Sequence, residues 1–246
     1  MRPTPLRRAN RAAVVVFAAA AVAGCAGGAG STGDRDAVRS VAATPSAARS
    51  VAPAGATART TATPTPPPPV NVFPVRAAAA TVHYGRAHHD YPATDVFAPC
   101  GSVVVAPAAG RIAEVSAKDT WSSASDDGEA RGGLSFSIAG ADGVRYYGSH
   151  LATLTPAARP GATVAAGQQL GTVGRTGSAR GTACHLHVGL SPVCGPGDWW
   201  TRRGVVPPYA YLKAWQRGTQ RPPAAAVTAW KAAHGCPRSP AGVPDP

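Results

Sequence analysis

The sequence predicts a mostly β fold: an antiparallel sheet that forms a groove or sandwich, with a short helical C-terminal extension. From Phe73 onward the chain consists of short apolar runs broken by glycine and proline, with turn signals between them. Long helical patterns are absent from this stretch. Closely spaced short strands of this kind are typical of a sheet or sandwich.

The expected elements follow one another at short intervals. Strand-like runs lie at residues 103–106, 111–115, 134–138, 143–147, 169–173 and 183–190. Between the second and third of them, residues 121–133 are polar and contain glycine, so we expect a loop long enough to border a groove. Helical patterns follow at residues 209–215 and 224–233, and we expect them to pack as the C-terminal extension.

Residues 1–25 resemble a bacterial lipoprotein signal peptide. Four arginines precede an apolar run at residues 12–23, which is too short for a comfortable membrane span. The run ends in Val22-Ala23-Gly24-Cys25, similar to the lipobox in which the cysteine takes the lipid. We therefore expect an exported protein that lipid at Cys25 anchors to the outer face of the cell membrane. An ordinary signal peptide cleaved nearby is the alternative.

The next segment, residues 26–70, contains mainly Ala, Pro, Thr, Ser and Gly. Such a composition buries too little apolar surface to offset the entropy of ordering, so we expect a disordered tether. The predicted organisation is thus a signal peptide (1–25), a tether (26–70), a folded domain (71–198) and a C-terminal extension (199–246).

Charge and cysteine content indicate where such a protein works. The chain has a net charge of +12; the signal region holds four arginines and no acid, so the rest keeps +8. These charges are scattered, which favours diffuse attraction to an anionic envelope, and we expect no nucleic-acid partner and a monomer.

Four cysteines remain after Cys25, and an even number in an exported chain suggests two disulfides. Of the three possible pairings we favour Cys184–Cys194 and Cys100–Cys236. Zinc ligation by cysteine is the competing interpretation, but no C-x-x-C spacing supports it.

The motif that organises the chain is Ala183-Cys184-His185-Leu186-His187-Val188-Gly189-Leu190. Apolar residues alternate with the two histidines, so a strand places both imidazoles on one face. Two neutral imidazoles on rigid backbone form half of a metal site, and imidazole suits zinc. Three further segments belong with it: residues 85–99 with His88, His89 and Asp95, residues 146–151 with His150, and the glycine-rich residues 160–177.

This ordered set of motifs resembles the M23 (LytM/lysostaphin-type) zinc metallopeptidases over about residues 73–191. Their pattern is a His…Asp motif, a Tyr-x-His-type motif and a final His-x-His. The resemblance implies an M23-type fold and a catalytic Zn²⁺ held by His89, Asp95 and His187, with the fourth position open. It also implies that His150 and His185 orient and deprotonate the zinc-bound water and stabilise the oxyanion.

One departure concerns the first ligand. The family places three residues between this histidine and the aspartate, whereas five separate His89 from Asp95. Because the insertion is smaller from His89, we prefer it as the ligand, and His88 remains the alternative.

The function that the resemblance implies is hydrolysis of peptide bonds in peptidoglycan. The alternatives are a non-catalytic M23-like activator, or a wall-binding lipoprotein that uses Trp199, Trp200 and Trp215. The chain has no G-x-S-x-G, H-E-x-x-H or P-loop motif, which excludes those enzyme classes.

Overall fold

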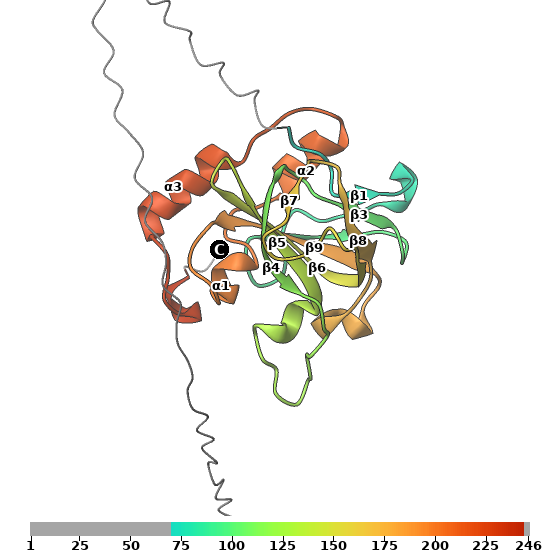
Figure 1. The fold of residues 1–246 in the computed structure, drawn as a ribbon, viewed down its shortest axis with the longest axis horizontal. Helices are drawn as coiled ribbons and strands as arrows, with labels where there is room; N and C mark the ends of the chain where they lie inside the picture. Colours follow the sequence, from blue (N-terminus) through green and yellow to red (C-terminus); the bar gives the residue numbers. More distant parts are fainter. Residues whose placement is uncertain (1–69, 244–246) are drawn as a thin grey trace, which may run out of the picture. The chain divides into compact units, whose positions relative to one another are not determined.

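A computed structural model describes residues 70–243; Cys25, the expected signal peptide and nearly all of the expected tether lie outside these residues. Nine strands form one antiparallel sheet (Figure 1), which confirms the predicted mostly β fold class. The strands are β1 (Val75–Arg76), β2 (Ala93–Phe97), β3 (Val103–Val105), β4 (Gly110–Ser116), β5 (Leu134–Gly140), β6 (Val144–Leu154), β7 (Thr163–Val164), β8 (Gln169–Val173) and β9 (His185–Pro192).

Short helices complete the described part of the chain, and none of them is long and apolar enough to cross a membrane. Residues 121–133 form the expected loop, interrupted by one 3₁₀ turn. The α-helices are α1 (Trp199–Arg202), α2 (Tyr209–Gln216) and α3 (Ala224–His234), and the 3₁₀ helices are η1 (Ala79–Thr81), η2 (Ala130–Gly132), η3 (Gly177–Gly181) and η4 (Pro240–Gly242).

The sheet branches at its longest strand, β6. One edge of β6 pairs with β5. The other edge pairs first with β9, from Val144 to Ser149, and then with β8 from Leu151 onward. His150 lies at the change of partner and has a φ of +66°. Left-handed backbone is unfavourable for a residue with a side chain, and here it marks the point where β6 turns from one neighbour to the next.

The two faces of the sheet differ in chemistry because alternate residues point to opposite sides. Val96, Leu186 and Val188 belong to the hydrophobic core. Leu212 and Trp215 of α2 join the same core, so the predicted C-terminal helices pack onto the folded domain. The alternate positions of β2, β6 and β9 include Asp95, Ser149, His185 and His187, and they form the face that carries the site described below.

The structure contains two disulfides, as expected, but the favoured pairing is wrong. Cys100 bonds to Cys184, with the Cα atoms 5.3 Å apart, and Cys194 bonds to Cys236 at 5.7 Å. Cys184 directly precedes β9 and Cys194 follows it, so a straight strand of roughly 25 Å keeps these two apart. β2 runs antiparallel to β9, which brings Cys100, just beyond β2, beside Cys184.

Candidate metal centre and cleft

The centre of the site is a cross-strand pair on the polar face. In the β2–β9 register Asp95 lies directly opposite His187 and Phe97 opposite His185. The Nδ1 atom of His187 is 2.9 Å from Oδ1 of Asp95. His185 Nε2 lies 4.0 Å from the same oxygen, because residues two apart on a strand share a face. The period-two pattern of the sequence therefore places these three side chains correctly.

The third member of the cluster, His88, comes from the loop before β2. Its backbone N–H donates to the Ala93 carbonyl at 3.1 Å, which folds the loop back over the strand. Its Nε2 atom lies 3.8 Å from Oδ2 of Asp95, and its side chain is only 8% exposed. His88, Asp95 and His187 each offer one ligand atom within 4.8 Å of the others. This is the geometry from which three side chains can hold one ion.

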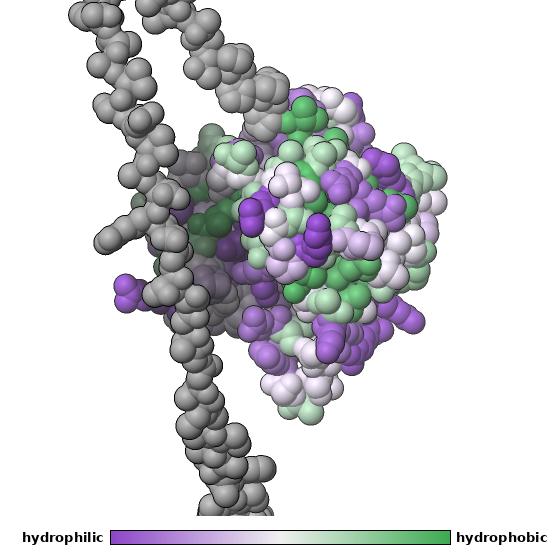
Figure 2. Space-filling view, viewed as in Figure 1, coloured by the Kyte–Doolittle hydropathy of each residue, from purple (hydrophilic) through white to green (hydrophobic). Residues whose placement is uncertain are grey.

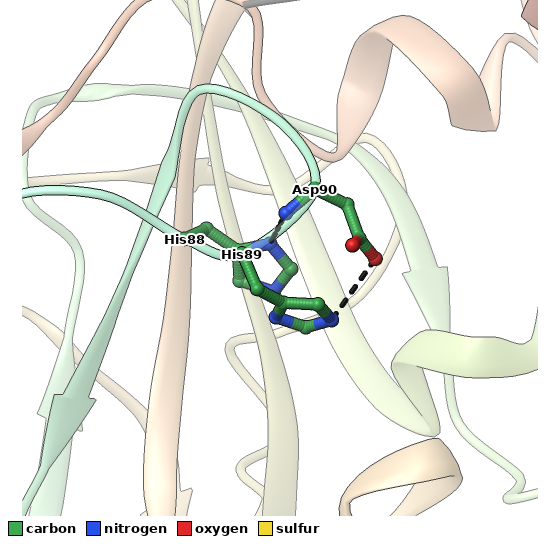
Figure 3. Close-up of side chains that lie close together, drawn as sticks. All are labelled: His88, His89 and Asp90. Carbon is green, nitrogen blue, oxygen red and sulfur yellow. Dashed lines mark hydrogen bonds and ion pairs between the residues drawn. The ribbon is translucent and has the colours of Figure 1, made fainter.

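The structure brings His88, rather than the preferred His89, beside Asp95 and His187. The His89 side chain is 75% exposed, and its Nε2 lies 2.9 Å from Oδ2 of Asp90. Figure 3 shows His89 paired with Asp90 alongside the His88 ring. The residues around Tyr91 form a turn, with the Ala93 N–H donating to the Tyr91 carbonyl at 2.7 Å. That turn absorbs the additional residues, so His88 reaches Asp95 and the longer spacing is no obstacle.

Backbone carbonyls hold the other three imidazoles of the site. Each of these rings bonds one of its two nitrogens to a carbonyl oxygen, which places the proton on that nitrogen and leaves the second nitrogen as a lone pair. The bonds join His187 Nε2 to Arg203 at 2.8 Å, His150 Nδ1 to Thr176 at 2.9 Å, and His185 Nδ1 to Ala183 at 2.9 Å. In His187 the other nitrogen, Nδ1, faces Oδ1 of Asp95, the side on which these two residues could share a metal ion.

Electrostatics act on the protonation of His88, His150 and Asp95. Burial, followed by the charge of His187, lowers the pKa of His88 to about 4. Burial, followed by the charges of His187 and His185, lowers the pKa of His150 to about 3. Burial would raise the pKa of Asp95, but the hydrogen bond and charge of His187 outweigh it and hold that pKa well below its usual range. Near neutral pH His88 is therefore neutral and Asp95 ionised, and imidazole together with carboxylate is a donor set that fits Zn²⁺.

His150 lies beside the cluster, its ring 4.9 Å from that of His185 and 5.9 Å from that of His187. Thr176, whose carbonyl accepts from His150, is itself held by two strands. Its hydroxyl accepts from the Leu134 N–H of β5 at 3.0 Å and donates to the Leu151 carbonyl of β6 at 2.8 Å. The expected pair, His150 and His185, is thus brought together next to Asp95 and His187.

A cleft of about 100 Å³, partly open to solvent, lies beside the cluster. Its walls come from the loop before β2, the predicted loop at 121–133, β6 and α1. The histidines that line it are His88, His89, His150 and His187. Sequence reasoning missed the residues that support the site through their carbonyls, Arg203, Thr176 and Ala183, because a backbone acceptor has no signature in residue type.

Gly189 supports the site for a steric reason, because it leaves room for the Arg203 carbonyl. It pairs with Ala93 of β2 and Tyr147 of β6, and a Cβ at this position would lie 2.4 Å from the Arg203 carbonyl oxygen. Only glycine therefore lets the end of α1 approach β9 closely enough for His187 to donate to that carbonyl.

We expect Gly189→Ala to displace this carbonyl, with a loss of about 1–3 kcal/mol of stability from overpacking. Zinc affinity should fall about 10-fold to 100-fold, as for loss of other groups that orient a metal ligand. Thermal unfolding and a zinc titration measure the two effects. Gly181→Ala is the matched control, because a Cβ there meets nothing within 4 Å. Equal zinc affinity in both variants would contradict this role for Gly189.

Comparison with known families bears on the same residues. Residues 89–197 match the model of Peptidase family M23, and this match contains Asp95, His150, His185 and His187. These residues belong to peptidase family M23. The matched segment, residues 89–197, is thus a domain of a peptidase family, in agreement with the motifs.

Solved structures similar to the chain include M23 peptidases. The catalytic domain of lysostaphin from Staphylococcus simulans is 24% identical, with a TM-score of 0.42, over 55% of this chain and 94% of that one. The catalytic domain of the M23 protein EnpA from Enterococcus faecalis is 22% identical, with a TM-score of 0.41, over 56% and 97%. A zinc-containing peptidase from Vibrio cholerae is 21% identical, with a TM-score of 0.39, over 56% of this chain and 39% of that one. A comparison with curated protein sequences gives no match.

Proposed function

We propose that this protein is a zinc endopeptidase that hydrolyses peptide bonds of peptidoglycan. The observation that carries the proposal is the convergence of His88, Asp95 and His187, from two segments far apart in the sequence, beside a cleft that His88 and His187 line. Membership of its domain in the M23 family supports the same activity.

The three side chains fit zinc in number and kind, since catalytic zinc takes three protein ligands and leaves one position open. We assign His88, Asp95 and His187 as the ligands. Zinc held there would polarise a peptide carbonyl and make water a nucleophile near neutral pH. The Arg203 carbonyl contributes by holding the His187 ring in one orientation, with Nδ1 facing Asp95.

His150 and His185 complete the chemistry. Each donates from Nδ1 to a backbone carbonyl, so each can accept a proton at Nε2. The bond from Nδ1 to the Thr176 carbonyl leaves Nε2 of His150 free to take a proton from the attacking water. Once protonated, a histidine in this position can return the proton to the leaving amine and stabilise the oxyanion.

The rest of the sequence supports a location at the cell wall. The signal peptide with its lipobox would anchor the chain at Cys25, and residues 26–70 would give the domain reach from the membrane. A net charge of +8 outside the signal region favours attraction to anionic wall polymers. The two disulfides suit an oxidising exterior.

The two non-catalytic alternatives have less support. An activator needs no ligand set, whereas a full set can be assigned here. A wall binder would need its tryptophans exposed, but Trp215 is only 3% exposed and Trp200 donates its indole N–H to the Pro237 carbonyl. Figure 2 shows hydrophilic and hydrophobic residues intermixed over the face that it draws. Among residues 70–243 the large hydrophobic residue that stays exposed is Val70.

Purified peptidoglycan provides the test. We expect the zinc-loaded protein to release muropeptides detectable by mass spectrometry, and His187→Ala to reduce the rate at least about 100-fold, the scale of losing one transition-state group. Equal release by the variant would refute the assignment. Metal analysis separates the binding alternatives, which need no zinc. In cells, Cys25→Ser should move the protein from the membrane fraction to the medium if lipid anchors it.

A further inference from the structure

Two of the three arginines that line the cleft are paired with carboxylates, and Arg203 is the exception. Arg202 donates to Glu114 at 2.8 Å, and Arg131 pairs with Asp126. Among residues 70–243, no carboxylate lies within the 4.0 Å of an ion pair from the Arg203 guanidinium, although this side chain also lines the cleft.

Arg203 is held in place by aromatic rings. Its guanidinium carbon lies 4.0 Å from the centre of the Tyr91 ring and 5.4 Å from that of Trp199. The Tyr91 ring in turn lies 4.3 Å from the ring of His88 and 5.7 Å from that of His187. The guanidinium is therefore one aromatic ring away from two of the assigned zinc ligands.

The local environment leaves this cation incompletely satisfied. Its Nε atom is buried and has no hydrogen-bond partner in the described part of the chain. Burial is the largest influence on the pKa of Arg203 and lowers it. Arg203 is half buried, whereas the more deeply buried Arg145 and Arg202 each have a carboxylate within 2.8 Å. Since desolvation of a charge is costly without a partner, Arg203 is arranged to receive an anion.

We propose that Arg203 binds a carboxylate of the substrate peptide beside the cleaved bond, so that peptides with a free carboxyl group are selected over amidated ones. This inference rests on the proposed peptidase function. A planar guanidinium matches a carboxylate with two parallel hydrogen bonds, and stacking on Tyr91 holds its plane. Such charged hydrogen bonds are strong enough to decide between two otherwise identical substrates.

The test uses a matched pair of substrates: a cross-linked wall peptide with one free carboxyl group next to the cleaved bond, and the same peptide with that group as the carboxamide. We expect the zinc-loaded wild type to prefer the carboxylate about 10-fold to 100-fold in kcat/KM. Arg203→Gln should bring this ratio close to one. Arg203→Lys should keep part of the preference for the carboxylate, because lysine keeps the charge but cannot make the two parallel hydrogen bonds of the guanidinium.

Arg175→Gln is the control, since it removes the same charge from an exposed residue outside this cleft. An unchanged ratio in Arg203→Gln, or an equal decrease in Arg175→Gln, would overturn the proposal. So would an equal loss of kcat on both peptides, which would make Arg203 part of the general machinery. Calorimetric binding of the two peptides to zinc-free protein gives a second readout that needs no turnover. A binding preference that Arg203→Gln abolishes would support the carboxylate site even if neither peptide is cleaved.

Discussion

His88→Ala should abolish zinc binding and peptidase activity, whereas His89→Ala should leave both almost unchanged. The two residues are neighbours in the sequence, but only His88 has its ring beside Asp95 and His187, with Nε2 at 3.8 Å from the carboxylate. Loss of a group that merely orients a ligand costs about 10-fold to 100-fold in zinc affinity, so loss of a ligand should exceed about 100-fold. Zinc content after dialysis and muropeptide release measure the two effects.

His89→Ala is a sharp control because it removes the same imidazole one residue away. Its partner, Asp90, is exposed, and an exposed ion pair contributes at most about 1 kcal/mol, so thermal stability should stay close to that of the wild type. Zinc loss in His89→Ala with full retention in His88→Ala would reverse the ligand assignment. Unfolding curves of both variants show whether either effect arises from misfolding.

Much of the fold could be predicted because its strands are short, regular and half buried. The runs at 134–138 and 169–173 correspond to β5 and β8, and the helical patterns at 209–215 and 224–233 correspond to α2 and α3. The alternation of apolar residues and histidines also predicts that His185 and His187 share one face of the strand. Burial on the opposite face enforces this periodicity, so the pattern and the structure agree.

The sequence could not predict what depends on turns and on backbone approach. The choice between His88 and His89 depends on how a turn at Tyr91 absorbs additional residues, and spacing alone does not describe a turn. The disulfide pairing depends on strand register, since β9 separates Cys184 from Cys194. The carbonyl that orients His187 depends on the close approach of α1 to Gly189, which the sequence shows only as one more glycine.

A second large effect is expected at the ion pair of Arg145 and Asp198, which is buried beneath α1. The Nη1 atom of Arg145 lies 2.6 Å from Oδ1 of Asp198, and the two side chains are 2% and 6% exposed. Asp198→Ala should cost about 3–5 kcal/mol of stability, because it leaves the arginine charged and buried without a partner. Chemical denaturation measures this free energy of unfolding.

Two comparisons isolate the cause. Asp198 precedes α1 but its side chain makes no capping hydrogen bond, so loss of a helix cap does not contribute. Arg180→Met breaks a pair in which the arginine is 50% exposed, and it should cost no more than about 1 kcal/mol. The double variant Arg145→Met with Asp198→Leu removes both charges and should recover most of the stability lost by Asp198→Ala. The buried charge would not be the cause if the loss of stability in the double variant equalled the sum of the losses in the single variants Arg145→Met and Asp198→Leu.

Asp198 leads directly into the helix that carries Arg202 and delivers the Arg203 carbonyl to His187. Asp198→Ala should therefore also weaken zinc binding at temperatures where the domain is still folded.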